Sequence, residues 1–210
     1  MDTLSYLANI EHAPELGILT PIPLDKKSPI VLRNMTREHL AKLFKELGYK
    51  VGVEIGVSRG EYSHCLWKAN PESVIYGIDP WQVYAGYEEP YTKKRMEECY
   101  EETLSRLDGT SCILIRKFSM EAALDFDSDS LDFVYIDGNH EFMHVASDIA
   151  VWSDKVRPGG IVSGHDYARY KREAACHVKD VVNSWTYSHG IHPWFVLRGK
   201  SNSSWFWVKK

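Results

Sequence analysis

Residues 51–60, with the sequence VGVEIGVSRG, decide the fold of this chain. The apolar run at 51–55 predicts a short buried strand, and Gly56 and Gly60 let the backbone turn tightly into a following helix. Glu54 places a carboxylate near the end of that strand, where it would repel a diphosphate. A serine also stands where the GxGxxG pattern of dinucleotide-binding folds needs its second glycine. The turn therefore favours a ligand that carries positive charge.

Short apolar runs alternate with helix-like segments along most of the chain. Besides 51–55, the runs that predict strands are 74–78, 112–115, 131–136, 160–163, 194–197 and 204–208. Helices are expected between them, including one that begins after Thr36 and one with an apolar stripe at Val145, Ile149, Trp152 and Val156. This alternation predicts an α/β fold with a mostly parallel sheet of seven strands and helices on both faces. A short turn joins the last two runs, so the final strand is expected to be antiparallel.

The length of 210 residues predicts one domain, spanning residues 1–210. Prolines interrupt the first 34 residues, so we expect an irregular N-terminal arm that forms a lid or a homodimer contact. The formal net charge of −4 argues against a dedicated nucleic-acid binder, and no apolar run approaches the roughly 20 residues that cross a bilayer. The four cysteines are far apart and form no CxxC pair, which argues against a zinc cluster or a disulfide framework. We expect a cytoplasmic protein.

The carboxyl ends of parallel strands form the edge at which ligands bind in open α/β sheets. Asp79 follows the strand at 74–78, where an acidic side chain can accept hydrogen bonds from both hydroxyls of a ribose. Trp81, two residues on, can stack on an adenine. Structural alternatives stay open at these positions: Gly56 and Gly60 can form an ordinary turn, and Asp79 can cap the segment before Pro80.

Three later motifs carry a family resemblance. They are YIDGNH at 135–140, RPGG at 157–160 and GHDY at 164–167. With the turn at 51–60, they make the chain similar to the class I S-adenosylmethionine-dependent methyltransferases, and within them it resembles the small-molecule O-methyltransferases. The resemblance covers residues 51–167. It implies a Rossmann-like sheet, S-adenosylmethionine as the cofactor, and a hydroxyl oxygen of a small molecule as the acceptor.

The resemblance also implies roles for single residues of the cofactor site. The residues expected to contact S-adenosylmethionine are Glu54, Gly56, Ser58, Gly60, Asp79, Trp81, Ser119 and Asp137. Glu54 and the glycines match the loop around the methionine and ribose, Asp79 matches the ribose-binding acid, and Ser119 matches the adenine contact. For Ser119, the alternative is the N-cap of a helix.

The reacting end is expected where two strands finish side by side. Relatives that use a metal hold magnesium at positions matching Asp137, His165 and Asp166, but an imidazole is an unusual magnesium ligand. A softer divalent ion, or no metal, therefore remains open. Asp137 and His140 are the candidate catalytic residues, with His140 as the base that takes the acceptor's proton or, alternatively, as a helix cap.

Other polar and aromatic residues near this edge have less specific interpretations. His144 and Asp148 follow His140 at helical spacing, and we expect them to form a solvated polar face rather than a zinc site. The aromatic residues Trp81, Tyr84, Tyr87 and Tyr91 can form an acceptor pocket or cover a helix. Two other functions also remain open: a nucleotide-cofactor oxidoreductase, and a non-catalytic cofactor-binding protein with the same fold.

Overall fold

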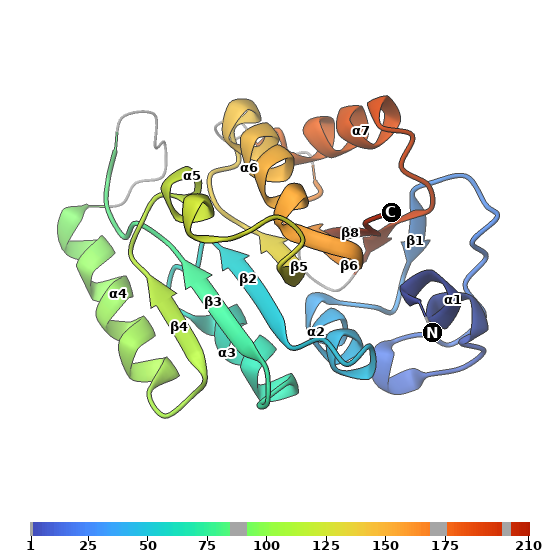
Figure 1. The fold of residues 1–210 in the computed structure, drawn as a ribbon, viewed down its shortest axis with the longest axis horizontal. Coiled ribbons are helices and arrows are strands. Elements are labelled where there is room, and N and C mark those ends of the chain that lie inside the picture. Colours follow the sequence, from blue (N-terminus) through green and yellow to red (C-terminus); the bar gives the residue numbers. More distant parts are fainter. Residues whose placement is uncertain (1, 85–91, 169–175, 199–202) are drawn as a thin grey trace.

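The structure, a computed structural model, describes residues 2–84, 92–168, 176–198 and 203–210. Within these residues the centre of the molecule is an eight-stranded sheet with the order β1-β7-β8-β6-β5-β2-β3-β4 (Figure 1). The strands are β1 Ile30–Leu32, β2 Val51–Ile55, β3 Val74–Ile78, β4 Cys112–Ile115, β5 Leu131–Ile136, β6 Val156–Gly164, β7 Trp194–Leu197 and β8 Ser204–Val208. The predicted α/β fold is therefore confirmed, with one strand more than the seven expected.

Most strand pairs are parallel, and the last strand is the exception. β8 lies between β6 and β7 and is antiparallel to both, as the closing turn predicted. The parallel pairs β2·β5, β2·β3 and β3·β4 bring the carboxyl ends of four strands together at one edge of the sheet. β6 is longer than the predicted run at 160–163. It begins directly after the preceding helix, at Val156, which the sequence pattern had assigned to that helix.

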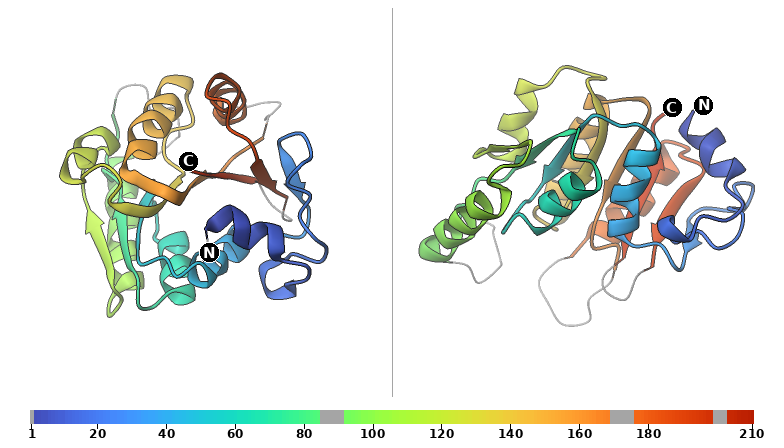
Figure 2. Two further views of the ribbon diagram at one scale, coloured as in Figure 1. Left: turned by 45° about the vertical axis from the view of Figure 1, so that its right-hand side comes forward. Right: turned by 90° about the horizontal axis from the view of Figure 1, so that it is seen from below.

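Helices cover both faces of the sheet (Figures 1 and 2). Their bounds are α1 Thr3–Asn9, α2 Arg37–Glu46, α3 Glu61–Ala69, α4 Lys93–Leu107, α5 Ser119–Ala122, α6 Phe142–Lys155 and α7 Val178–Ser188, with short 3-10 turns at Pro14–Leu16 and Ala123–Asp125. Thr36 is the N-cap of α2, as predicted. None of the helices in the described parts of the chain has the length and apolar character to cross a membrane.

Alternating side chains of the strands divide most of the described interior into two large apolar cores, beside a small third cluster around Trp81. On β5, Phe133 and Tyr135 pack with residues of α1, α2 and α3, whereas Val134 and Ile136 pack with residues of α5, α6 and α7. This alternation is the two-residue period of a strand that is buried on both faces. The sheet is therefore covered by packed apolar side chains on both faces, and the strands that end at the ligand edge belong to this packed layer.

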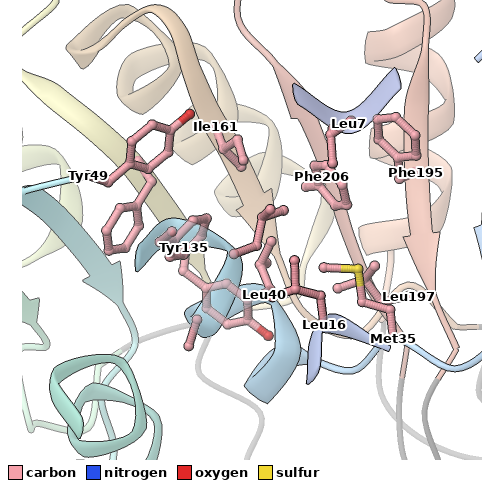
Figure 3. Packing of buried hydrophobic residues seen from close by; sticks show 14 of the residues in the cluster. Leu7, Leu16, Met35, Leu40, Tyr49, Tyr135, Ile161, Phe195, Leu197 and Phe206 are labelled. Atoms are coloured by element: carbon pink, nitrogen blue, oxygen red, sulfur yellow. The ribbon is translucent and has the colours of Figure 1, made fainter. Parts of the chain in front are cut away.

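The N-terminal segment is part of the first core, which corrects the expectation of an irregular surface arm. Leu7 and Leu16 are almost fully buried, and Figure 3 shows them among Phe195, Leu197 and Phe206. Residues 30–32 form β1, which pairs in parallel with β7 and is the additional strand. The prolines ruled out a long helix, but they did not prevent short elements from packing against the sheet.

Candidate functional site

A cavity of about 750 Å³ lies at the carboxyl ends of β2, β3 and β5 and extends to the start of α5. Its wall includes a carboxylate from each of the three strand ends, Glu54, Asp79 and Asp137. The strand order β5-β2-β3-β4 sets these groups in the sequence Asp137, Glu54, Asp79, followed by Ser119 after β4. The cavity therefore runs across the strand ends, with acidic groups spaced along it.

Glu54 lies on β2 and is only 2% exposed. The hydroxyl of Ser63, on α3, donates a short hydrogen bond to its carboxylate. Burial raises the pKa of Glu54 to about 8, and the nearby carboxylates of Asp137 and Asp79 raise it further against the effect of Ser63. A cationic ligand beside Glu54 would favour the ionised form, so this residue is suited to a positively charged group.

The turn after β2 brings the backbone close to β5. Gly56 has a φ of +85°, and a Cβ atom at this position would lie 2.1 Å from the carbonyl oxygen of Asp137. A side chain is therefore excluded both by the left-handed backbone and by space. Gly60, at the N-cap of α3, also has a positive φ, but it lies outside the cavity lining.

Asp79 lines the cavity and binds the backbone on two sides of it. Its two carboxylate oxygens accept hydrogen bonds from the backbone N–H groups of Ser58 at 2.9 Å and Trp81 at 2.7 Å. Burial raises the pKa of Asp79, although the backbone donors oppose that rise. A carboxylate has about four lone-pair sites, so Asp79 can still accept a hydrogen bond from a ligand.

Trp81 lines the cavity but is itself buried, with 1% of its surface exposed. Its indole N–H donates to the carbonyl oxygen of Ser58 at 2.7 Å, and its ring lies 4.8 Å from that of Tyr100. The side chain of Trp81 therefore holds the turn after β2 in place. Its stacking on an adenine remains a prediction.

Ser119 lines the far end of the cavity and is linked to two residues of α6. Its hydroxyl accepts a hydrogen bond from the indole N–H of Trp152 at 2.8 Å and donates one to Asp148 at 2.5 Å. Asp148 is 5% exposed and also lines the cavity, so the expected solvated face at this position was wrong. A stronger signal was present in the sequence: positions 145, 148, 149 and 152 share one face of a helix, which here is the buried face.

The predicted reacting groups do meet at the ends of β5 and β6. The Nε2 atom of His140 lies 3.2 Å from Asp166 and 3.5 Å from Asp137. One ligand atom from each of these three residues lies within 4.8 Å of the others, so they could hold a metal ion together. The Nδ1 atom of His165 lies 3.3 Å from Asp166 and 3.7 Å from Asp137, which keeps it beside the same cluster.

Arg37, at the start of α2, is a cavity residue that sequence reasoning missed. Its guanidinium lies 3.7 Å from the carboxylate of Asp137 and 5.0 Å from the centre of the Tyr62 ring. No local signal pointed to Arg37, because α2 reaches the cavity only when it packs on the sheet. Of the aromatic residues considered for an acceptor pocket, Tyr84 lines the cavity, whereas Tyr87 and Tyr91 lie outside the described residues.

Comparison with known families gives a match over the part of the chain that builds this cavity. The sequence profile of a family described as "Methyltransferase domain" matches residues 53–167, which is more than half of the 210 residues. The chain is also 28% identical over 140 residues to the uncharacterized protein R132 of Acanthamoeba polyphaga mimivirus, covering 64% of this chain. It spans less than two thirds of the curated relatives that it matches, 58% of R132 and 13% of a second one.

Solved structures share the fold at low sequence identity. The O-methyltransferase TomG from Streptomyces achromogenes, in complex with SAM, aligns with a TM-score of 0.59 and 14% identity, covering 100% of this chain and 96% of that one. The cofactor-bound protein Rv0187 from MTB aligns with a TM-score of 0.57 and 16% identity, covering 83% and 79%. At such identities the likeness shows the fold alone.

Proposed function

The chain belongs to the methyltransferase domain family, and from that premise we propose that it transfers a methyl group from S-adenosylmethionine to a hydroxyl oxygen of a small molecule. The observation that carries the proposal is the row of carboxylates Asp137, Glu54 and Asp79 along one cavity. S-Adenosylmethionine carries a sulfonium and an ammonium group, so acidic groups at this place suit it. The volume of about 750 Å³ also lies in the range of small-molecule sites.

The two ends of the cavity differ in chemistry, which supports one orientation of the cofactor. One end is charged, with Glu54, Asp137 and the guanidinium of Arg37, and suits the ammonium, sulfonium and carboxylate of the methionine part. The other end includes Phe118, Met120 and Met143 and suits the base. Asp79 lies between them in the strand order and is proposed to accept the hydrogen bonds of the ribose hydroxyls.

The reacting groups are proposed to lie at the charged end. The acceptor oxygen attacks the methyl carbon, the bond from that carbon to sulfur breaks, and S-adenosylhomocysteine leaves. The proton of the acceptor hydroxyl goes to His140, the proposed base, whose imidazole is oriented by the carboxylates of Asp137 and Asp166.

The same cluster fits a divalent metal ion, which we propose as an aid to the reaction. Asp137 and Asp166 with an imidazole from His165 or His140 form a mixed oxygen and nitrogen donor set, which suits manganese, iron or zinc better than magnesium. A bound ion would supply a lower pKa for the acceptor hydroxyl. If His140 serves as a ligand, it is no longer the base, so the two roles of His140 make different predictions.

Calorimetric titration with S-adenosylmethionine, S-adenosylhomocysteine and NAD tests the cofactor. We expect binding of the first two and none of NAD; the reverse would favour the alternative of a nucleotide-cofactor oxidoreductase. Turnover of methyl-labelled cofactor with a panel of hydroxylated small molecules tests the reaction. Cofactor binding without transfer to any of them, or with transfer only to nitrogen acceptors, would contradict the proposed O-methylation.

The organisation of the protein is also a proposal. We propose that residues 1–210 act as one methyltransferase domain in the cytoplasm, with a small-molecule acceptor rather than nucleic acid or a membrane as partner. Of the two roles considered for residues 1–34, a homodimer contact is retained, because β1 is an edge strand, whereas a lid would have to withdraw Leu7 and Leu16 from the core. Light scattering of the purified chain tests this, and a monomer at all concentrations would rule out the dimer.

A further inference from the structure

A directed chain of hydrogen bonds ends on the carboxylate of Asp148. The indole N–H of Trp152 can only donate, so the Ser119 oxygen accepts from it at 2.8 Å. The hydroxyl proton of Ser119 is then turned toward Oδ1 of Asp148, 2.5 Å away. Ser119 has thus used its one donor on the protein itself, whereas the Asp148 carboxylate keeps acceptor capacity in a part of the cavity wall that also includes His144 and Ser147.

The second oxygen of Asp148 is the one available. Among the described residues, the bond from Ser119 is the one hydrogen bond that the Asp148 carboxylate makes, and no cation lies within ion-pair distance of it. Oδ2 lies beside the backbone of Gly138, where an added Cβ atom would be 3.8 Å from it. Burial raises the pKa of Asp148 to about 6, so a donor from a ligand would stabilise the ionised carboxylate.

The surroundings of Asp148 define the ligand group that fits. Phe118, Met120 and Met143 line the same end of the cavity with apolar surface, although Met120 and Met143 are 38% and 71% exposed. A flat aromatic base with a hydrogen-bond donor at its rim satisfies both the apolar surface and the buried acceptor. Adenine fits, because its faces stack on apolar surface and its exocyclic amino group is its donor, while its ring nitrogens accept hydrogen bonds.

We propose that Oδ2 of Asp148 accepts a hydrogen bond from the exocyclic amino group of the bound adenine, and that Asp148 thereby selects an amino purine over a 6-oxo purine. The inference rests on the proposed function, since the base belongs to S-adenosylmethionine. Ser119 is then a positioning residue that orients Asp148, rather than the side chain that contacts the base.

The test compares two ligands by calorimetry at pH 8, where Asp148 is ionised. S-Adenosylhomocysteine offers the amino group at position 6, whereas S-inosylhomocysteine offers there a 6-oxo group, which only accepts hydrogen bonds, and carries its donor at the neighbouring ring N1. We expect the wild-type protein to bind the first at least tenfold more tightly, because a buried carboxylate facing an oxygen loses its hydrogen bond. In Asp148→Asn the new amide N–H can donate to the 6-oxo group, so the preference should shrink by about tenfold or more.

The control is Asp154→Asn, which makes the same change on an exposed part of α6 and should keep the wild-type preference. A 6-deamino analogue of S-adenosylhomocysteine gives a second measurement that needs no variant, and it should bind the wild-type protein about 10- to 100-fold less tightly than the parent compound. Equal binding of the deamino analogue, or an unchanged preference in folded Asp148→Asn, would overturn the inference while leaving the proposed function intact. If the wild-type protein bound neither S-adenosylmethionine nor S-adenosylhomocysteine, the proposed function itself would fail, and this inference with it.

Discussion

A Cβ atom on Gly56 would lie 2.1 Å from the carbonyl oxygen of Asp137. The turn after β2 therefore packs directly against the chain that leaves β5 at Asp137. This contact lies in the cavity wall, between the ends of the strands that bring Glu54 and Asp137 there. The proposed cofactor site includes this turn, so a side chain at Gly56 should disturb it.

Gly56→Ala should abolish cofactor binding and destabilise the protein by well over the roughly 1 kcal/mol that a positive φ alone costs. Gly48→Ala is the matched control, because Gly48 has a similar φ of +71° but nothing within 4 Å of an added Cβ atom. Urea unfolding and calorimetry on both variants measure the two effects. Equal losses of stability would show that the backbone conformation, and not the contact with Asp137, limits this position.

Asp79→Ala should weaken S-adenosylhomocysteine binding at least tenfold, because charge-assisted hydrogen bonds contribute about 1.5 to 3 kcal/mol each. The variant also loses the acceptor for the N–H groups of Ser58 and Trp81, so its folding must be checked by circular dichroism. Asp125→Ala, at an exposed carboxylate paired with Lys117, serves as the control. Unchanged affinity in folded Asp79→Ala would mean that the ribose binds elsewhere.

Trp81→Phe should lower cofactor affinity by about tenfold, because it keeps an aromatic ring but removes the N–H that holds the carbonyl of Ser58. Trp207→Phe, in the buried part of β8, should leave affinity unchanged. Trp152 is unsuitable as a control, since its indole N–H donates to Ser119 in the cavity wall. Equal effects of the two substitutions would reduce Trp81 to a structural aromatic residue.

Glu54 should make the stability of the cofactor-free protein depend on pH. Its pKa is about 8 in the fold against 4.5 as the reference value, so the folded state holds the extra proton between these values, and the free energy of unfolding falls as pH rises through that range. The full effect is on the order of 5 kcal/mol. Glu54→Gln cannot ionise and should lose this fall, becoming more stable than the wild type near pH 8 while binding the cofactor less tightly.

Urea unfolding at pH 5 and pH 8.5 measures this difference. Glu101→Gln, at an exposed position of α4, is the matched control and should follow the wild-type pH dependence. Parallel pH profiles of the wild type and Glu54→Gln would show that Glu54 is ionised already in the cofactor-free fold.

The cluster of Asp137, His140 and Asp166 has two proposed roles, to hold a metal ion and to supply a base. The two roles predict different effects of chelation on turnover. If a metal ion assists, chelation should abolish turnover, added manganese should restore it, and Asp166→Ala should lower turnover as chelation does, with cofactor affinity largely kept. If His140 works as a base without metal, chelation should do little and His140→Ala should lower the rate by roughly 10²-fold or more. Full activity of the wild type with chelator, together with full activity of His140→Ala, would contradict both roles.

Much of the fold was predictable from local sequence, and the reason can be seen in the strands. The predicted runs at 51–55, 74–78, 112–115 and 131–136 coincide with β2 to β5, because each is a short apolar segment bounded by turn or helix signals. β1 was missed, since three residues carry too little pattern to stand out from a proline-rich segment. Its pairing with β7, some 165 positions later, is what makes it a strand.

The candidate site was likewise predictable from the sequence only in part. The sequence by itself determined which residues end the strands, and Glu54, Asp79 and Asp137 do line one cavity, because parallel strands bring their carboxyl ends to one edge. Only the tertiary structure decided that Arg37 reaches that cavity, and that the carboxylate of Asp148 is buried there while the hydroxyl of Ser119 is used to hold it. These contacts depend on how α2 and α6 pack across the sheet, and packing between elements distant in the chain is set by the shapes of whole faces, which the local sequence pattern does not record.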